Sequence, residues 1–295
     1  MSEPISFDFA EYVRKRKLGA AEGGSAEESY AYSGDLEAQA QVRKLAPVVM
    51  AMEAIVRLGK NLQKNQLLGH AVLVTPKQFP NVHRLAAEAA RRLGTTVPTV
   101  YVTQAMDLNA FTSGSETDSF VVLHSGLIDH LSEEELLFVI GHEAGHIHNG
   151  HVTLLSVVYY LTRIGGRFLQ AIVMPALLAL QSWSRRAEIT CDRAGLMCVR
   201  DLQVAQRALI KLALGSQKLY EQIDIEEYLK QLEAGKEGLG KYAEILSSHP
   251  YLPKRVESLR IFAESRIFRE KALGQHGGLD KATIDARVAN VIRVK

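Results

Sequence analysis

Cysteine is scarce in this chain: its 295 residues include only two, Cys191 and Cys198. They lie seven positions apart in what we predict to be one helix, which places their Cα atoms about 10 Å apart, too far for a disulfide. The opening residues, MSEPISFDFAEY, also lack the basic stretch and the apolar stretch of a secretory signal. Both absences favour a reducing, cytoplasmic location.

An excess of charge of one sign is missing as well. The formal net charge is +2, with 23% charged and 47% hydrophobic residues, which is typical of a folded soluble protein. Nothing in this balance favours a nucleic-acid partner, which requires clustered Lys and Arg. A basic run at 14–17 leads into a stretch rich in Gly, Ser, Ala and Glu, so we expect residues 1–34 to form a flexible segment. The basic run is compatible with a solvated tail or with contact to a membrane or an acidic partner.

Apolar runs long enough to cross a membrane are also absent. The two strongest, residues 152–162 and 168–180, are separated by two arginines and two glycines, whereas a spanning helix needs roughly 20 apolar residues. Pro175 would in addition kink the second run. We therefore predict an apolar helical hairpin at 152–183. It is compatible with two helices buried in the core, or with peripheral contact to the inner face of a membrane.

The most informative feature present is the pentapeptide HEAGH. Ser132, followed three residues later by Glu135, is typical of the capping box that begins a helix, and apolar residues continue at helical spacing. On such a helix His142 and His146 lie one turn apart on one side, as two ligands of a single metal must. Glu143 points about 100° away, where it can face a metal-bound water. The alternative is a purely structural pair of histidines.

A third candidate ligand lies downstream of this helix. Glu188 and Asp192 are four residues apart, so one helix face would offer a carboxylate ligand and, one turn on, a second carboxylate. The second can accept the far ring N–H of a ligand histidine and so orient it. Two histidines and one carboxylate leave the fourth position of a zinc site open for water, as catalytic sites require. Ala194 and Gly195, which follow, permit close helix packing.

The remaining pattern is that of an α+β protein. Short β-like runs are predicted at three places: residues 71–75, 97–103 and 119–124. An amphipathic helix is predicted at 80–94, a hairpin connection at 112–119, and helices throughout after Gly150. Because small strands precede the HEAGH helix directly, we expect a small sheet packed on helices. One folded domain is expected over residues 35–271, followed by a C-terminal tail or helix at 272–295.

At this point the chain resembles the HtpX/Oma1-type gluzincin metallopeptidase family. The resemblance covers about residues 75–260 and is carried by five blocks in the expected order: Asn109-Ala-Phe-Thr-Ser-Gly114, residues 121–131, HEAGH, SRRAEITCDRAG at 184–195, and Ser248-His-Pro-Tyr-Leu-Pro-Lys-Arg255. It implies a mainly helical zincin-like fold over 35–271, with a small β-sheet packed on the HExxH helix. Membrane members of the family carry clear spanning helices, so the interrupted apolar runs favour a soluble or peripheral member.

The resemblance also implies a role for each residue of the site. It assigns zinc binding to His142, His146 and Glu188. It assigns the role of general base to Glu143, and that of the carboxylate that orients a ligand to Asp192. It places Asn109, Ala110 and Phe111 on an edge strand along which the substrate backbone lies, and Arg255 where it can anchor its loop to the active-site helices. An extended peptide that adds to a sheet edge gains main-chain hydrogen bonds, which suits unfolded or extended protein substrates.

The chemistry expected of this set is hydrolysis of a peptide bond. Zinc lowers the pKa of its bound water towards about 7, and Glu143 removes a proton as that water attacks the scissile carbonyl. His249, held on a turn by Pro250, is a candidate partner of the oxyanion, with a turn-stabilising hydrogen bond as the alternative. His148 and His151 are expected at the surface or beside a ligand. The predicted function is a zinc-dependent endopeptidase; the alternatives are a non-catalytic zinc-binding scaffold and a membrane-associated quality-control factor.

Overall fold

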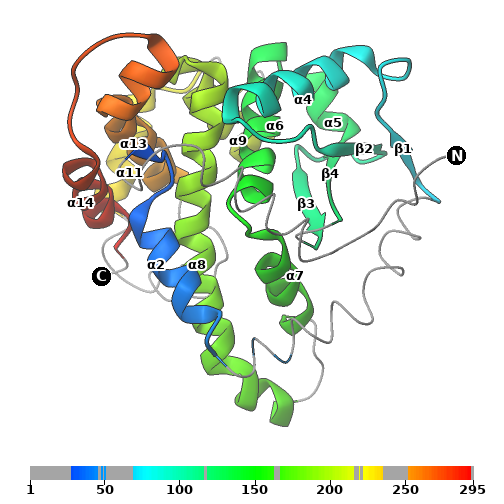
Figure 1. Ribbon diagram of the computed structural model, residues 1–295, viewed down its shortest axis with the longest axis vertical. Coiled ribbons are helices and arrows are strands. Elements are labelled where there is room, and N and C mark those ends of the chain that lie inside the picture. Colours follow the sequence, from blue (N-terminus) through cyan, green and yellow to red (C-terminus); the bar gives the residue numbers. More distant parts are fainter. Residues whose placement is uncertain are drawn as a thin grey trace, which may run out of the picture.

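The computed structural model of the chain (Figure 1) describes residues 28–45, 48, 50, 69–115, 118–162, 167–215, 219, 222–234 and 252–293. Helices make up most of the fold and a small sheet lies on one side of it, beside α6 (Figure 1), in line with the predicted α+β class. In chain order the elements are α2 (Ser33–Val42), β1 (Ala71–Leu73), α4 (Pro80–Leu93), β2 (Thr99–Thr103), β3 (Ala110–Gly114), β4 (Ser119–His124), α5 (Ser125–His130), α6 (Glu133–His148), α7 (Val152–Leu161), α8 (Arg167–Val199), α9 (Leu202–Leu214), α11 (Ile225–Ala234), α13 (Leu252–Ala263), the π-helix η2 (Phe268–Ala272) and α14 (Lys281–Ile292).

Helices α6 and α8 form the centre of the fold, with α2 alongside α8 and α4 against α6 (Figure 1). Small residues let the two central helices approach closely. A Cβ atom on Gly195 would lie 2.7 Å from the ring of Phe138, and one on Gly145 would lie 2.8 Å from Cβ of Ala194. The close packing predicted at Ala194 and Gly195 is therefore confirmed.

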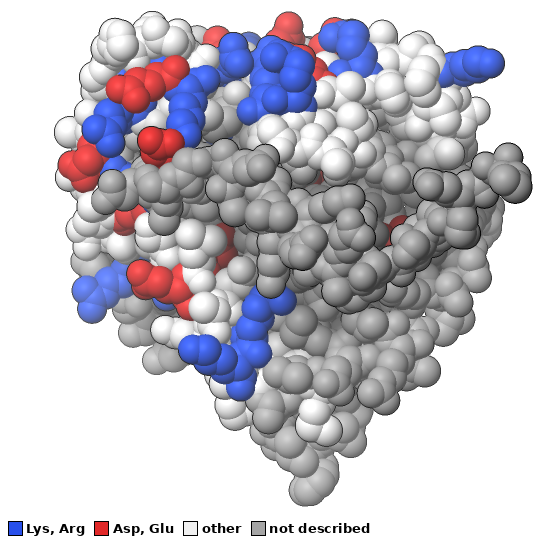
Figure 2. Space-filling model, in the orientation of Figure 1, with Lys and Arg blue, Asp and Glu red and all other residues white. Residues whose placement is uncertain are grey.

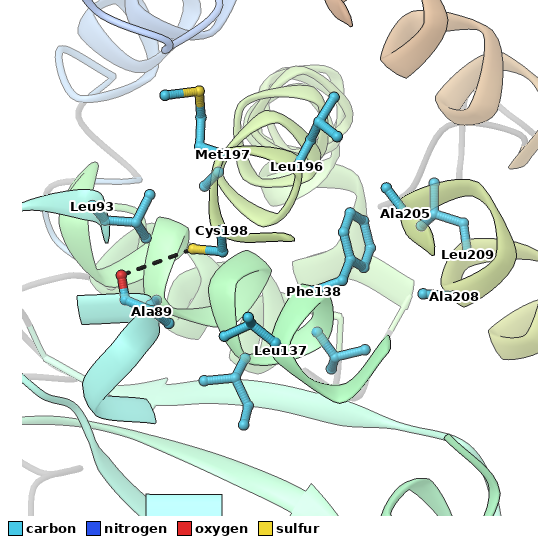
Figure 3. Packing of buried hydrophobic residues seen from close by; sticks show 14 of the residues in the cluster. Ala89, Leu93, Leu137, Phe138, Leu196, Met197, Cys198, Ala205, Ala208 and Leu209 are labelled. Carbon is cyan, nitrogen blue, oxygen red and sulfur yellow. Dashed lines mark hydrogen bonds between the residues drawn. The ribbon is translucent and has the colours of Figure 1, made fainter. Parts of the chain in front are cut away.

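The core around these helices is filled by side chains from α4, α6, α8 and α9 (Figure 3). Phe138 of α6 faces Ala205 and Leu209 of α9 (Figure 3). On the other side, Sγ of Cys198 lies 3.8 Å from the carbonyl oxygen of Ala89. Both cysteines are free and buried, as predicted. Burial raises the pKa of the Cys198 thiol to about 12, so this residue packs as a small apolar group.

The sheet has four strands in the order β1-β2-β4-β3; β2 and β4 are parallel and the other two pairs are antiparallel. One part of the prediction is wrong here. Strand β3 includes the first three residues of the segment expected to be a hairpin connection, 112–114, so the connection to β4 begins only after Gly114. Its Thr-Ser-Gly sequence has little β-like pattern, but pairing with β4 and contact with α6 and α7 hold it extended.

The apolar segment 152–183 forms α7 and the first half of α8. Helix α8 does not end at Pro175 but continues to Val199, so the second apolar run and Glu188 lie on one helix. Leu154, Leu180 and Trp183 are buried in a second hydrophobic cluster between α7, α8 and α2, as expected for core helices. Within the described residues, no helix is long and apolar enough to cross a membrane. Peripheral contact with a membrane stays a prediction.

The N-terminal boundary lies earlier than predicted. Residues 1–27 are outside the described part of the chain, but Ala31 and Tyr32 are buried. The backbone N–H of Tyr32 donates a hydrogen bond to Oγ1 of Thr190 on α8 at 3.1 Å. A flexible segment that extends to residue 34 is thus wrong for this part, because an aromatic side chain and a buried hydrogen bond fix it to the core.

A buried arginine joins both ends of the described chain to α8. Nη1 of Arg193 lies 2.8 Å from Oδ1 of Asp285 on α14, and its guanidinium lies over the rings of Tyr32 (5.3 Å) and Phe262 (4.7 Å). Asp285 Oδ2 also accepts the backbone N–H of Ser33 at 3.1 Å. Helix α14, which lies in the stretch expected to be a C-terminal tail or helix, therefore packs on the same core as α8.

Charged side chains of opposite sign are interspersed on the surface. On the face shown in Figure 2, Lys and Arg of the described residues alternate with Asp and Glu. Several form exposed pairs, such as Arg84 with Glu133 at 2.6 Å and Arg260 with Glu226 at 3.0 Å. Pairs of this kind contribute at most about 1 kcal/mol each, so the fold rests on the buried helix contacts.

Candidate metal centre and cleft

Helix α6 begins with the predicted capping box. Oγ of Ser132 accepts the backbone N–H of Glu135 at 3.3 Å, and Oε2 of Glu135 accepts the backbone N–H of Ser132 at 2.8 Å. The buried Glu135 also accepts from Nζ of Lys211 on α9 at 2.9 Å. These bonds satisfy two otherwise unpaired donors and fix the start of the helix that carries HEAGH.

His142, His146 and Glu188 converge between α6 and α8. Nε2 of His142 lies 3.5 Å from Oε2 of Glu188, and Nε2 of His146 lies 3.5 Å from Oε1 of Glu188. All three residues are buried. Two ligand atoms bound about 2.1 Å from one tetrahedral ion lie about 3.4 Å apart. The donor set and its spacing therefore fit a metal ion such as zinc.

Cys191 offers a second candidate for the third ligand. One ring nitrogen of each histidine and Sγ of Cys191 all lie within 4.8 Å of one another. However, Sγ is 3.7 Å from Nδ1 of His151, which is itself 3.2 Å from Nδ1 of His146. The thiol thus contacts His151, which lies on the Nδ1 side of His146, whereas Glu188 faces Nε2 of both histidines. Burial raises the pKa of Cys191 well above its ordinary value, so the thiol stays protonated in the metal-free site.

Asp192 and Arg255 flank the ligand candidates. Oδ1 of Asp192 lies 3.0 Å from Nδ1 of His142. Arg255, from α13, donates from Nε and Nη2 to the two oxygens of Asp192 at 2.8 and 2.7 Å, and its Nη1 lies 3.2 Å from Oε2 of Glu188. One guanidinium therefore binds both carboxylates, and helix α13 is joined to α8 at the site.

These charges shift the pKa values of the group. Burial alone raises the pKa of Asp192, but the charge and hydrogen bonds of Arg255 hold it below its usual range. Burial lowers the pKa of Arg255, but the carboxylates of Asp192 and Glu188 raise it by more. The pKa of Arg255 therefore lies above its ordinary value. For His142, burial lowers the pKa, but Glu188 and Asp192 raise it above its ordinary value. The site thus places the buried carboxylates of Asp192 and Glu188 next to the imidazoles of the candidate ligands.

Glu143 lies beside the ligand candidates and faces strand β3. The hydroxyl of Thr112 donates to Oε2 of Glu143 at 2.6 Å, and Oγ1 also lies 3.2 Å from the Glu143 backbone oxygen. A side chain of the edge strand therefore holds the carboxylate in place. Sequence reasoning missed Thr112, because the connection was expected to begin there.

A cleft of about 680 Å³ opens above these residues. His142, Glu143, His146 and Glu188 lie among its lining residues, together with Asn109 to Ser113 of β3 and its approach. The remaining lining residues come from α7, the residue that follows it, and α8: Leu155, Ser156, Val158, Tyr159, Thr162, Gln181 and Ser184. The cleft therefore runs between the edge of the sheet and the apolar hairpin, with the candidate metal ligands in its wall.

A model of one peptidase family matches this part of the chain. The model of peptidase family M48 matches residues 76–263, more than half of the chain and the region that contains the cleft. The chain belongs to peptidase family M48. The resemblance inferred from the five sequence blocks is thereby confirmed.

Curated relatives carry names that agree with this family. A plastoglobule-localized metallopeptidase 48 of Arabidopsis thaliana is 36% identical over 169 residues, which cover 56% of this chain and 49% of that protein. A protease HtpX homolog of Streptococcus pyogenes is 26% identical over 254 residues, covering 73% of this chain and 85% of that protein. A protease HtpX of Aliivibrio fischeri is 27% identical over 208 residues, covering 58% and 69%. The aligned part thus spans about half of the plastoglobule relative. No solved structure matches the chain significantly.

In this M48 member the edge of β3 that no described strand pairs with has a defined pattern. The backbone N–H of His124 donates to the carbonyl oxygen of Asn109 at 3.1 Å. Because bonded and non-bonded pairs alternate in an antiparallel ladder, Phe111 also turns its backbone groups towards β4. Ala110 and Thr112 turn theirs to the open edge. The side chain of Phe111 packs against the cluster on the far face of the sheet.

Two further residues of the M48 site were predicted only loosely or not at all. His151 was expected at the surface or beside a ligand; it is fully buried, 3.2 Å from His146. Asp35, which sequence reasoning did not single out, lies 3.1 Å from the other nitrogen of His151. Burial lowers the pKa of His151. Burial raises the pKa of Asp35, but His151, Thr190 and Trp183 hold it below its usual range.

The signal for His151 is partly local, since Asn149-Gly150 is typical of a helix end. Asp35 has no local signal, because it lies more than a hundred residues away from its partners. His249, the candidate oxyanion partner, lies outside the described residues.

Proposed function

We propose that this chain is a zinc-dependent endopeptidase, with His142, His146 and Glu188 as zinc ligands and Glu143 as general base. The observation that carries the proposal is the convergence of two histidines on one carboxylate in the wall of the cleft: each Nε2 atom lies 3.5 Å from an oxygen of Glu188. Membership of a peptidase family, with relatives named as a metallopeptidase and as proteases, supports the same class of reaction.

Bound zinc would supply an activated water, with a pKa lowered towards about 7. Glu143 would take a proton from the attacking water and later pass it to the leaving amine. The hydroxyl of Thr112 binds Oε2 of Glu143, which leaves Oε1 to accept that proton. His249 stays our candidate for the group that stabilises the oxyanion.

Glu188 is a better third ligand than Cys191 on geometric grounds. The Nδ1 atoms of the two histidines already face Asp192 and His151, so each histidine has its Nε2 atom available for the metal. Both Nε2 atoms point towards Glu188. Arg255 supports this arrangement, because its guanidinium pairs with the carboxylates of both Glu188 and Asp192 and so fixes them.

The proposed substrate is an unfolded or extended stretch of protein. The outward-facing backbone groups of Ala110 and Thr112 would pair with a peptide that adds as a new strand to the edge of β3. Of the three residues predicted for this role, Ala110 fits best, since Asn109 and Phe111 turn their backbone groups towards β4. Main-chain pairing is independent of sequence, so side-chain preference would come from the cleft wall formed by α7 and α8.

Removal of the metal tests the proposal directly. The purified full-length protein is expected to bind about one zinc ion per chain and to cleave casein, an unfolded protein. Treatment with 1,10-phenanthroline should abolish cleavage, and added Zn²⁺ should restore it. Mg²⁺ is the matched control, because it prefers oxygen ligands in octahedral geometry and should restore nothing. Cleavage that persists after complete removal of metal would contradict the proposal.

The third ligand is tested by two alanine variants one helical turn apart. Glu188→Ala should bind zinc at least about 100-fold more weakly than wild type, since loss of a ligand should exceed the 10- to 100-fold effect typical of an orienting residue. Cys191→Ala should keep wild-type zinc affinity, because a protonated thiol that contacts His151 is not needed for binding. Competition with a chromogenic chelator measures both. Wild-type zinc affinity in Glu188→Ala, together with weaker binding in Cys191→Ala, would make Cys191 the third ligand instead.

A further inference from the structure

A fully buried carboxylate, that of Asp35, takes no part in the mechanism above. It is 0% exposed, and it accepts hydrogen bonds from Oγ1 of Thr190 at 2.6 Å and from Nε1 of Trp183 at 3.0 Å. Its Oδ2 lies 3.1 Å from Nε2 of His151. That contact is close and electrostatically favourable, although its angle lies outside hydrogen-bond range. An ion this deeply buried costs several kcal/mol unless it is paired. The hydrogen bonds and the contact with His151 are therefore needed to stabilise the carboxylate of Asp35.

The turn after α6 places His151 between this carboxylate and the metal ligands. The backbone N–H of His151 donates to the carbonyl oxygen of His146 at 3.0 Å, and that of Gly150 donates to Ile147 at 3.2 Å. This is the Schellman arrangement of a helix end, with Gly150 at a φ of 67°. It turns the chain back, so that Nδ1 of His151 lies 3.2 Å from Nδ1 of His146.

Helix α2 holds the same turn from outside. Nε2 of Gln39 donates to the carbonyl oxygens of Asn149 and Gly150 at 3.1 and 3.3 Å. Nη2 of Arg43 donates to the oxygen of Gly150 at 2.7 Å. The helix that supplies Asp35 therefore also fixes the backbone next to His151.

We propose that Asp35, acting through His151, is a positioning residue for the ligand His146; this inference rests on the proposed zinc site. A histidine that binds metal through Nε2 carries its proton on Nδ1. That N–H can donate to Nδ1 of His151, which then carries its own proton on Nε2, the atom that faces Asp35. The chain of contacts has one consistent set of proton positions, and it ends on a negative charge.

In this arrangement each of the two ligand histidines is oriented on its Nδ1 side by groups that include a carboxylate. His142 is oriented by Asp192 and Arg255 from α8 and α13, and His146 by His151 and Asp35 from the turn after α6 and from α2. Each support fixes a ring orientation and increases the basicity of the ligand. The segment around Asp35 is thus a component of the metal centre rather than a covering layer.

The zinc affinity of three variants of the full-length protein tests this inference. Asp35→Asn and His151→Phe are each expected to weaken zinc binding about 10- to 100-fold, the usual effect of losing a residue that orients a ligand. Because the two act in series, the double variant should bind zinc no more weakly than His151→Phe alone. Chelator competition gives the affinities. Emission of the single Trp183, which contacts both residues, reports whether the local fold is retained.

Asp285→Asn is the matched control. Asp285 is also a buried aspartate and binds the first residue of α2, through the backbone N–H of Ser33, but it contacts neither histidine. Its variant should lose stability and keep zinc affinity. Wild-type zinc affinity in Asp35→Asn, or losses that add in the double variant, would overturn the inference while the zinc site stands. A wild-type protein that binds no zinc would overturn the proposed function itself.

Discussion

Replacement of Glu143 by Gln is expected to lower the rate of casein cleavage about 10²- to 10⁴-fold, the usual contribution of a positioned general base. Gln has nearly the same shape and can still accept the hydroxyl hydrogen of Thr112, but its amide cannot take a proton from the attacking water. Zinc content should remain that of wild type, because Glu143 is not among the proposed ligands. Cleavage rate and bound zinc are to be measured on the same preparation.

A second glutamate of α6 provides the control for this variant. Glu134 is exposed in the first turn of the helix, so Glu134→Gln makes the same chemical change away from the cleft and should cleave casein as wild type does. Wild-type cleavage by zinc-loaded Glu143→Gln would contradict the proposed mechanism. Loss of zinc together with cleavage would place Glu143 among the ligands.

Replacement of Arg255 by Met is expected to lower the free energy of unfolding by about 3–5 kcal/mol, the usual cost of removing one partner of a buried ion pair. Met fills a similar volume, but it leaves the carboxylates of Asp192 and Glu188 buried without their shared cation. Urea unfolding should be followed with a chelator present, so that weaker zinc binding by the variant does not contribute to the difference.

The pH dependence of this loss has a definite sign. Pairing with Arg255 holds the pKa of Asp192 below its usual range, so the pair stabilises the fold above the unfolded pKa, about 4, and this stabilisation is lost as the pH falls through the lower folded value. The difference between wild type and Arg255→Met should therefore be largest near neutral pH and shrink in acid.

Arg260→Met, on the same helix, is the control for charge alone. Arg260 pairs with Glu226 at the surface, so its loss should cost no more than about 1 kcal/mol. Equal stability losses for Arg255→Met and Arg260→Met would contradict the assigned role of Arg255.

Local sequence patterns were sufficient for the elements that carry the candidate ligands. The capping box at Ser132 and the apolar spacing after it predicted the start of α6, and the described bonds match them. The spacing of His142 and His146, and of Glu188 and Asp192, follows from helix geometry alone. These predictions succeed because each depends on residues within a few turns of one another.

Other features depend on contacts that no local pattern encodes. The last three residues of β3, 112–114, were mistaken for a connection, because their polar sequence is extended only through pairing with β4 and contact with α6. The contact between Thr112 and Glu143 therefore depends on tertiary packing and not on the residues next to Thr112 in the sequence. The segment around Tyr32 was expected to be flexible, yet it is ordered by Thr190 and Arg193 of α8.

By itself the sequence determined the family, the α+β class, and which residues could bind a metal and move a proton. Only the tertiary structure decided how the ligand rings are held: it brought Arg255 to Asp192, Thr112 to Glu143 and, across more than a hundred residues, Asp35 to His151. The physical reason is that a helix repeat fixes positions along a few turns, whereas a buried charge is placed by whichever distant groups pack around it and replace its lost water.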